Sequence, residues 1–509
     1  MTAAAEMLPV HNGRAAELKR LPDLPLGELA RAVESAPSRE RRVAALFGAP
    51  EERGVRLYAL IAEDEESGLE LGSALVEGNS FPSMTPRCPE VHLFEREIAE
   101  QWDLRPEGHP WLKPVRFHRP YREGADVWER KASGAPPQVG VTDFYRVEGE
   151  EVHEVAVGPV HAGVIEPGHF RFQCHGEQVF HLEISLGYQH RGVERSLVGG
   201  PGKRTIHFME TLAGDTTVGH ATAYCQVLEG LAGCRPPARA QALRAVALEL
   251  ERLANHVGDL GALAGDVAFL PTAAYCGRLR GDFLNLTALL CGSRFGRGMV
   301  RPGGVGFDVD AARVAEMKQR LEAAAKDVGG AVGLLWTTAS VQARFEETGS
   351  VAQSVAKELG LVGVAARACG LRRDARKNHP SGIYQFAHIP MTLWHSGDVF
   401  ARAYVRWMEI QRSVAFITEQ LGQLPAGAVS AKCGEPKPSR ICASLVEGWR
   451  GEICHVGITG EDGRFRAYKV VDPSFHNWSG LAMALRDQQI SDFPLCNKSF
   501  NLSYCGHDL

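Results

Sequence analysis

Residues 236–260 have the sequence PPARAQALRAVALELERLANHVGDL, and the apolar spacing in this stretch decides much of the fold. Val246, Leu250, Leu253 and Val257 follow one another at gaps of 4, 3 and 4 positions. This spacing places the four side chains on one face of an α-helix. The two prolines at the start suit the first turn of a helix, because their φ angle is already close to the helical value. We therefore predict a long amphipathic helix that buries one face.

A β-hairpin is predicted upstream of this helix. Apolar and polar residues alternate in 170–174 and again in 180–186, and His175-Gly176-Glu177 between them has the composition of a turn. Helical spacing of apolar residues recurs further along the chain, and two short β-like runs follow near the end. We expect these helices and strands at 311–327, 351–369, 398–422, 454–458 and 467–471.

The composition is that of an ordinary globular chain. The 509 residues include 56 basic and 61 acidic ones, for a net charge of −5, and 44% are hydrophobic. This balance excludes a disordered, collagen-like or nucleic-acid-coating protein. The chain has no glycine-rich phosphate-binding motif of the dinucleotide or nucleotide type, so we expect that it binds no NAD(H).

The cysteines and the N-terminus indicate a cytosolic protein. None of the twelve cysteines forms a Cys-x-x-Cys pair, and we expect reduced thiols that pack as small apolar residues. Charged residues interrupt Met1–Leu21, so this segment has no signal-peptide core. No apolar run reaches the length of a membrane span. The chain could still dock on a membrane protein.

A change of composition divides the chain. Lys131-Ala-Ser-Gly-Ala-Pro-Pro-Gln138 combines glycine and paired prolines, which disfavour both helix and strand. We predict a first domain at 1–130, a linker at 131–150 and a second domain at 151–509.

Two sets of motifs resemble known families. Glu95-Arg-Glu-Ile98 followed by Gly108-His-Pro110 resembles the signature of the 30-kDa-type subunit of complex I. From about residue 158 onward the chain resembles the large subunit of [NiFe]-hydrogenases and the related 49-kDa subunit of complex I. The matching stretches are Gly158-Pro-Val-His161, Gly187-Tyr-Gln-His-Arg-Gly-Val-Glu194, Arg239-Ala-Gln241, Gly397-Asp-Val-Phe-Ala-Arg402, Arg450-Gly-Glu452 and Pro473-Ser-Phe475.

The fused order of the two parts is similar to group 4 hydrogenases of the formate-hydrogenlyase and energy-converting type. The resemblance implies an α+β fold class. It implies a small N-terminal α/β domain like the 30-kDa subunit, followed by a large, mainly helical domain like the hydrogenase large subunit, with a β-hairpin at its start.

The resemblance also locates the family's nickel site, and its ligands are missing. A nickel–iron centre takes four thiolates from two Cys-x-x-Cys pairs, because soft sulfur ligands suit the metal. In this chain the four cysteine positions fall on Ala213, Thr216, Ser503 and Gly506. We therefore expect no nickel. One alternative is a displaced site in an active hydrogenase or NADH:quinone oxidoreductase, with Cys225, Cys496 and Cys505 as its ligands.

Other residues match the surroundings of that site. Glu166 corresponds to a glutamate that relays protons in hydrogenases, although a solvated turn glutamate is an open alternative. In complex I the same cavity holds a quinone head, and the position of its tyrosine falls on Gly214, which has no hydroxyl group. An alternative for His220 is a hydrogen-bonded histidine of the core. An alternative for Arg450 is an ion pair with Glu447. The predicted cavity residues are His161, His169, Gly214, His220 and Arg450.

His190 and Arg191 match the stretch that, in complex I, faces the iron–sulfur cluster of a partner subunit. A guanidinium in that place stabilises the reduced cluster. The alternative is that Arg191 pairs with Glu194 along a helix.

These features imply a core subunit of a complex I-like or hydrogenase-related oxidoreductase assembly, peripheral on the cytoplasmic side of a membrane. We expect a small iron–sulfur subunit and membrane-arm subunits as partners, with no cofactor bound by this chain except possible quinone. Any oxidoreductase activity would then belong to the assembly and not to the isolated chain. A purely structural scaffold subunit is a further alternative.

Overall fold

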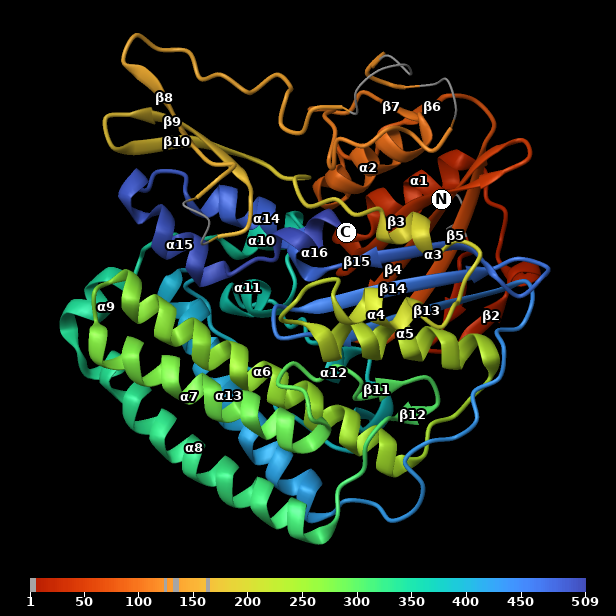
Figure 1. Cartoon of the computed structure of the whole chain (residues 1–509). Helices are drawn as coiled ribbons and strands as arrows, with labels where there is room; N and C mark the ends of the chain where they lie inside the picture. Colours follow the sequence, from red (N-terminus) through yellow and green to blue (C-terminus); the bar gives the residue numbers. More distant parts are fainter. Residues whose placement is uncertain (1–5, 123–125, 131–136, 162–164) are drawn as a thin grey trace.

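The computed structural model describes residues 6–122, 126–130, 137–161 and 165–509. Helices and strands are grouped in separate runs along the chain, which agrees with the predicted α+β class (Figure 1). Within these residues no helix is both long and apolar enough to cross a membrane.

The N-terminal part is built on an antiparallel sheet with the strand order β1-β5-β4-β3. The expected α/β arrangement would have parallel strands in the strict sense. The observed sheet is antiparallel, so this part of the chain is a strand meander with helices added. A short parallel pair, β6 and β7, follows. The elements are β1 (Leu8–Val10), α1 (Leu26–Ser35), β3 (Arg41–Glu51), β4 (Gly54–Glu63), β5 (Gly68–Val76), β6 (Ser80–Pro82), α2 (His92–Trp102) and β7 (Arg105–Glu107).

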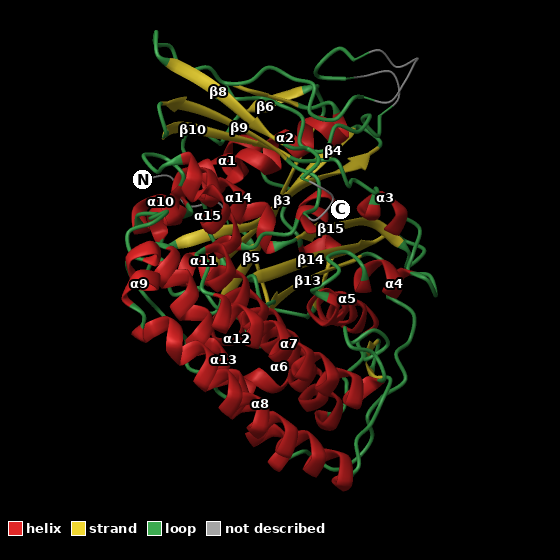
Figure 2. Cartoon of the chain, turned by 60° about the vertical axis from the view of Figure 1, so that its left-hand side comes forward, coloured by secondary structure: helices red, strands yellow, loops and turns green. Residues whose placement is uncertain are grey.

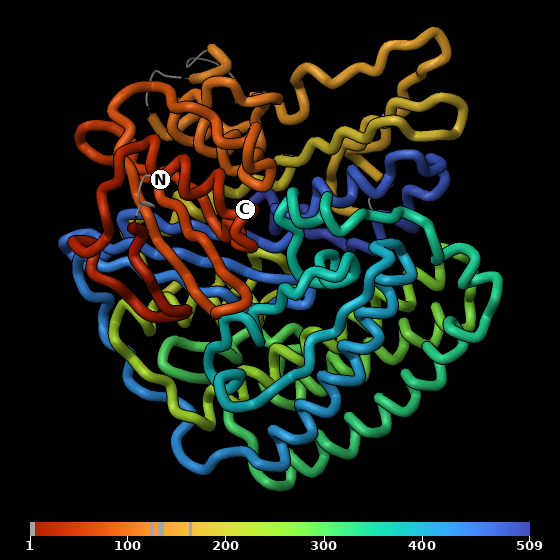
Figure 3. Tube along the Cα trace, turned by 180° about the vertical axis from the view of Figure 1, so that it is seen from behind, coloured from red at the N-terminus to blue at the C-terminus, as the bar shows by residue number. Residues whose placement is uncertain are grey.

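A second antiparallel sheet joins the two ends of the chain. Its order is β15-β14-β13-β2, and β2 (Ala15–Glu17) pairs with β13 (Arg440–Glu447) so that Ala16 lies opposite Ile441. The other two strands are β14 (Glu452–Thr459) and β15 (Phe465–Val471), as predicted. One hydrophobic cluster contains apolar residues from both sheets. Figure 3 shows the N-terminal strands in red lying against the blue C-terminal strands.

The predicted hairpin is confirmed as β9 (His169–His175) and β10 (Gln178–Ser185). A third strand that the sequence pattern missed, β8 (Val152–Val157), pairs with β9. Figure 2 shows this small sheet projecting above the helices. No helix or strand lies between 137 and 151 in the described part, and the remaining linker residues 131–136 lie outside it.

Long helices make up the layer below the second sheet (Figure 1). They are α5 (Thr217–Ala232), α6 (Ala238–Asp266), α7 (Leu270–Cys291), α8 (Ala311–Thr337) and α13 (Val399–Gly422). The helices predicted around 236–260, 311–327 and 398–422 are therefore confirmed.

The helix expected at 351–369 is wrong, because the chain breaks there into α10 (Gln353–Glu358) and α11 (Gly363–Ala368). At the break Gly363 has a φ of +64°, and a Cβ atom at this position would lie 2.2 Å from the carbonyl oxygen of Arg450. Only glycine allows the two backbones to come so close.

Shorter elements complete the fold. The helices are α3 (Val193–Leu197), α4 (Thr205–Glu210), α9 (Ala339–Phe345), α12 (Ala375–Asn378), α14 (Pro473–Ala484), α15 (Phe493–Phe500) and α16 (Tyr504–Asp508), and a two-stranded ribbon consists of β11 (Val300–Arg301) and β12 (Gly304–Val305). Single 3₁₀ turns lie at Leu18–Arg20, Pro37–Arg39, Pro89–Val91, Gly382–Gln385 and Ile490–Asp492.

A buried arginine connects the two sheets. Arg42 of β3 donates to Glu452 of β14, with an Nη1–Oε1 distance of 2.6 Å, and to Asp64 at 3.0 and 3.1 Å. Arg42 and Glu452 are both almost fully buried. A buried carboxylate that loses its cation is strongly destabilising, whereas an exposed ion pair contributes little.

We predict that Arg42→Ala lowers the free energy of unfolding by about 3 to 5 kcal/mol, because Glu452 and Asp64 lose their shared cation. Arg41→Ala is the matched control, since Arg41 pairs with Glu63 and Glu70 in a more exposed position, and we expect a loss of about 1 kcal/mol or less. Denaturant unfolding of both variants measures the difference. Equal losses would contradict a structural role for the buried pair.

Candidate functional site

The two segments that were predicted to carry the lost ligands meet in the structure. The Arg191 side chain donates to the carbonyl oxygens of Leu212 and Cys505, at 2.7 and 3.1 Å. Arg450 donates to the carbonyl oxygen of Asn501 at 2.5 Å and also pairs with Asp215. The loop before α5 and the chain around α16 are therefore held together by guanidinium groups.

None of the four predicted ligand positions offers a free sulfur or charged donor. Ala213 is buried and has no donor atom. The Thr216 hydroxyl donates to Asp215 at 3.0 Å and accepts from the indole of Trp449 at 3.1 Å. The Ser503 hydroxyl accepts from the amide of Gly506 at 2.9 Å and so caps α16. Both hydroxyl groups are thus engaged in hydrogen bonds within the protein.

The fourth position, Gly506, lies against a carboxylate. A Cβ atom at Gly506 would lie 2.7 Å from both Cγ and Oδ2 of Asp472 and 2.8 Å from the hydroxyl oxygen of Ser503. Asp472 also caps α14 by accepting from the amide of Ser474 at 2.8 Å. A cysteine side chain therefore does not fit at 506 unless Asp472 moves. The residues present do not fit the nickel–iron centre of the family.

Asp472 begins a buried hydrogen-bonded chain. Its Oδ2 lies 3.0 Å from Nε2 of His220, whose Nδ1 lies 3.1 Å from Nε2 of His455. The other nitrogen of His455 lies 2.9 Å from the Tyr468 hydroxyl. The Tyr468 hydroxyl can donate to His455, His455 to His220, and His220 to Asp472. One N–H group on each imidazole ring then satisfies all three contacts. Burial acts to raise the pKa of Asp472, but its interactions with His220, Arg450 and Ser474 together outweigh burial and leave that pKa below its usual value.

His220 is therefore the hydrogen-bonded core histidine of the alternative interpretation. Its side chain is completely buried, and both of its ring nitrogens have protein partners. A ligand in a cavity would find no free nitrogen on this residue. The predicted role of His220 in a quinone-like cavity stays a prediction, and in this geometry both ring nitrogens are engaged.

Arg450 pairs with Asp215 and not with Glu447. Its two terminal nitrogens lie 2.6 and 2.7 Å from the two Asp215 oxygens, and its guanidinium stacks over the Trp449 ring. Glu447 instead binds Arg367 at 2.7 Å. Burial acts to raise the pKa of Asp215, but the Arg450 charge and the hydrogen bonds from Arg450 and Thr216 together outweigh burial and lower that pKa.

The predicted residues of the hairpin loop lie at the edge of this site. Gly168 packs against the Tyr504 ring of α16, which places the loop next to Cys505. Burial raises the pKa of the Cys505 thiol to about 11, and the neighbouring Glu166 carboxylate acts in the same direction. Glu166 is thus half-buried beside a protonated thiol.

His161 has polar atoms without partners. Both of its ring nitrogens are buried, and neither has a hydrogen-bond partner among the residues that the structure describes. Nδ1 of His169 is in the same situation. Gly214 faces open space, because a Cβ atom there would meet nothing within 4 Å. Buried polar atoms without protein partners are typical of a place where water or a ligand binds.

Half-buried His190 and exposed Arg191 form one edge of the site. His190 bonds the carbonyl oxygen of Asp508 at 2.8 Å, and its ring stacks on His118 with a centroid distance of 4.8 Å. Arg191 itself is exposed and bonds backbone carbonyls only. Glu194 binds Gln101 and Lys469, so the alternative pairing of Arg191 with Glu194 is wrong.

The three cysteines of the displaced-ligand alternative are not brought together. Cys225 on α5 lies in the environment of Arg244 and Glu229, and burial raises its pKa strongly. Cys496 packs beside Arg402 and Gly349, where a Cβ atom on the glycine would lie 2.5 Å from its sulfur. No group of three His, Cys, Asp or Glu side chains among the described residues is arranged to hold a metal ion.

Sequence reasoning missed Glu251, a buried carboxylate on α6. Its oxygens accept from the amides of Val218 and Gly219 at 2.7 and 3.2 Å, at the start of α5. Burial raises the pKa of Glu251 to about 8 in spite of these bonds. Asp215 lies beside it and lines the same small cavity. The one signal in the sequence was the position of this glutamate, next to Leu250 on the apolar face of the predicted helix.

Comparisons with known proteins show which family the chain belongs to. A family described as "Respiratory-chain NADH dehydrogenase, 49 Kd subunit" matches residues 266–440. Hydrogenase-4 component G of Escherichia coli K12 is 30% identical over 88% of this chain and 79% of its own length, and formate hydrogenlyase subunit 5 of the same organism is 28% identical over 83% and 76%. The NADH-quinone oxidoreductase subunit 4 of Thermus thermophilus is 28% identical over 67% and 90%.

The helical layer, the hairpin and these extended similarities identify the chain as a subunit related to those of hydrogenases and of complex I. More narrowly, it belongs to the family of group 4 hydrogenase large subunits and complex I 49-kDa subunits.

We predict that Gly506→Ala lowers the free energy of unfolding by about 1 to 3 kcal/mol, because the new methyl group overlaps Asp472. Gly214→Ala is the matched control from the opposite segment, where the methyl group meets open space, and we expect a change of about 1 kcal/mol or less. Thermal or denaturant unfolding tests both. A neutral Gly506→Ala variant would show that Asp472 does not occupy this space.

We predict a pH-dependent effect of Glu251→Gln. The folded-state pKa of about 8 lies above the value near 4.3 expected in the unfolded chain, so this group favours folding at low pH and loses that contribution as the pH rises to 8. Relative to the parent, the glutamine variant should therefore gain on the order of 1 kcal/mol per pH unit between pH 5 and 7. Unfolding curves across this range measure the difference, and a constant difference would refute the buried, proton-binding state.

Proposed function

We propose that this chain is the nickel-free core subunit of a membrane-associated oxidoreductase assembly related to complex I and to group 4 hydrogenases. The proposal rests on the chemical groups at the four predicted ligand positions. Two of these positions have no donor atom, two have hydroxyl groups already engaged, and the carboxylate of Asp472 lies in the space that a side chain at 506 would need.

The site without its metal ligands would then transfer protons or bind quinone. Glu166, beside Cys505, is the proposed proton relay, because its carboxylate is half-buried at the edge of the site. His161 offers free ring nitrogens to a ligand carbonyl group, while Gly214 offers none. A quinone in this cavity would therefore be held through the His161 side.

The exposed edge at Arg191 would face the iron–sulfur subunit. Arginine keeps its charge at every accessible pH, and its contacts with backbone carbonyls hold that charge in one position without neutralising it. A nearby positive charge stabilises the reduced form of a cluster. His190, which stacks on His118, would form part of the same contact surface.

The names of the relatives support such an assembly. They include a formate hydrogenlyase subunit and an NADH-quinone oxidoreductase subunit. We propose that residues 1–130 act in assembly as a domain like the 30-kDa subunit, that 131–150 is a linker, and that 151–509 carries the site. The assembly would place this chain at the cytoplasmic face of membrane-arm subunits.

We predict that Arg191→Met shifts the midpoint potential of the nearest partner cluster to a more negative value in the purified assembly, because the reduced cluster loses a positive charge. Arg191→Lys should retain most of the potential, since it keeps the charge. Arg195→Met, the matched control, removes an exposed arginine that stacks on Tyr121 and should leave the potential unchanged. Redox titration followed by electron paramagnetic resonance measures all three.

Two outcomes would overturn the proposal. If Arg191→Met assembles normally and its cluster potential equals that of the parent, the cluster-facing role is refuted and a scaffold role is favoured. Elemental analysis of the same preparation should give nickel well below one atom per chain. Stoichiometric nickel would establish the hydrogenase alternative.

A further inference from the structure

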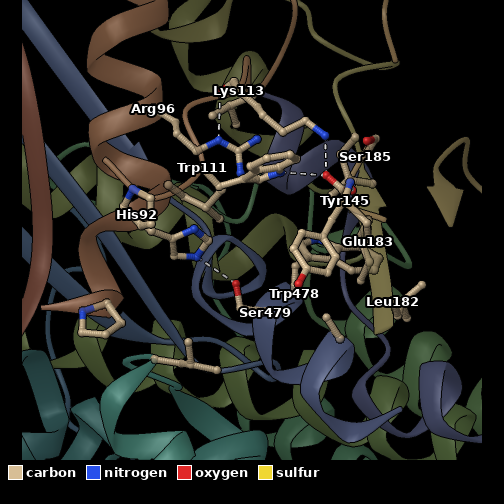
Figure 4. Close-up of a pocket in the computed structure, with 18 of the residues that line it drawn as sticks. His92, Arg96, Trp111, Lys113, Tyr145, Leu182, Glu183, Ser185, Trp478 and Ser479 are labelled. Atoms are coloured by element: carbon tan, nitrogen blue, oxygen red, sulfur yellow. Dashed lines mark hydrogen bonds and ion pairs between the residues drawn. The ribbon is translucent and has the colours of Figure 1, made fainter. Parts of the chain in front are cut away.

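A second cavity lies away from the vacated site, where the N-terminal part, the hairpin and α14 meet (Figure 4). Its volume is about 640 Å³, within the range of small-molecule sites. One side of α2, the loop 109–117, strand β10 and α14 form its walls. None of His161, Glu166, Gly214 or Arg450 lines it, so it is separate from the site described above.

Most of the wall is apolar. Leu93 of α2, Trp111 and Pro114 of the loop, Leu182 of β10 and Met483 of α14 all line the cavity. Aromatic and aliphatic side chains on opposite walls suit a ligand with a flat or extended hydrocarbon body.

The polar groups of the cavity carry an excess of positive charge. Glu183 is its one carboxylate among the described residues, and it is already bound by the Lys113 ammonium group, by the Trp111 indole at 3.1 Å and by the Tyr145 amide at 2.8 Å. Lys113 and Glu183 therefore neutralise each other.

Two guanidinium groups of the cavity form no ion pair with a carboxylate of the described residues. Arg96 donates only to the backbone carbonyl oxygens of Lys113 and Pro114, at 2.8 and 2.9 Å. Burial lowers the pKa of Arg96 to about 10, so the group still carries its charge at neutral pH. The side chain of Arg486, at the exposed rim, has no ion pair or hydrogen bond with any residue that the structure describes. A partly buried cation without an anion is a binding group for one.

A buried donor adds an independent observation. Trp478 lines the cavity and is only 3% exposed, yet its indole N–H group has no acceptor among the described residues. Buried donors in native structures are normally paired, and an unpaired one indicates a missing acceptor. Nε2 of the neighbouring His92 already lies 2.9 Å from the Ser479 hydroxyl oxygen.

We propose that this cavity binds an amphipathic organic anion, with its acidic group at Arg96 and Arg486 and its hydrocarbon body between the walls of α2, β10 and α14. The two arginines supply the charge that the protein itself leaves unbalanced. The apolar walls then select a ligand with a hydrocarbon body over inorganic anions, which have no surface to bury there.

A matched pair of fluorescent probes tests this proposal on the full-length chain. 8-Anilinonaphthalene-1-sulfonate and N-phenyl-1-naphthylamine share one aromatic skeleton and differ in the sulfonate group. We expect the sulfonate probe to bind one saturable site at least about tenfold more tightly than the neutral probe. Equal affinities, or only many weak sites, would refute a site that recognises an anion.

Variants locate the site. The double variant Arg96→Gln/Arg486→Gln should bind both probes with the same affinity, and the single variant Arg486→Gln, altered only at the exposed rim, should already lose several-fold in affinity for the sulfonate probe. Ala482→Trp, which fills the cavity, should abolish binding of both probes. Arg320→Gln on the exposed side of α8 is the control and should change nothing. Unchanged sulfonate binding in the Arg486→Gln and Ala482→Trp variants would overturn the proposal.

Discussion

Three arginines hold the last nine residues of the chain by their backbone carbonyl groups, and the site depends on this contact. Arg450 binds the carbonyl oxygen of Asn501, Arg191 that of Cys505, and Arg116 that of His507 at 2.8 and 3.0 Å. A helix as short as α16 has little stability of its own. Because the three arginines come from separate parts of the chain, Ser503 and Gly506 reach their positions only when all three parts have folded together.

The charges of the site are balanced by the protein alone. Asp215 neutralises Arg450, and Asp472 accepts from a histidine whose second nitrogen is also satisfied. Buried charges persist only where such partners exist. Residues 472 and 506 are also interdependent, because the Asp472 carboxylate has room only beside a glycine at 506. A cysteine restored at one position alone would disturb this balance before it could act as a metal ligand.

Local patterns carried the predictions that succeeded, and long-range contacts explain those that failed. The hairpin and α6 depend on spacing within a few residues, which the sequence displays directly. The pairing of β2 with β13 joins residues more than 400 positions apart, and the break before Gly363 results from contact with Arg450. In the site, neighbours in sequence suggested Glu447 as the partner of Arg450. The structure supplies Asp215 instead, a residue that no periodic pattern distinguishes.

The turn that carries Arg450 is itself held by buried charges on the helices. Arg252 of α6 donates to the carbonyl oxygens of Glu447 and Gly448, at 2.7 and 3.0 Å, and pairs with Glu409 of α13. Glu409 also binds Arg367, whose second contact is the Glu447 carboxylate. Each member of this network is fully or almost fully buried and has several partners, so removing one would leave charges exposed to a low-dielectric interior. The helical layer therefore positions Arg450 through these protein contacts.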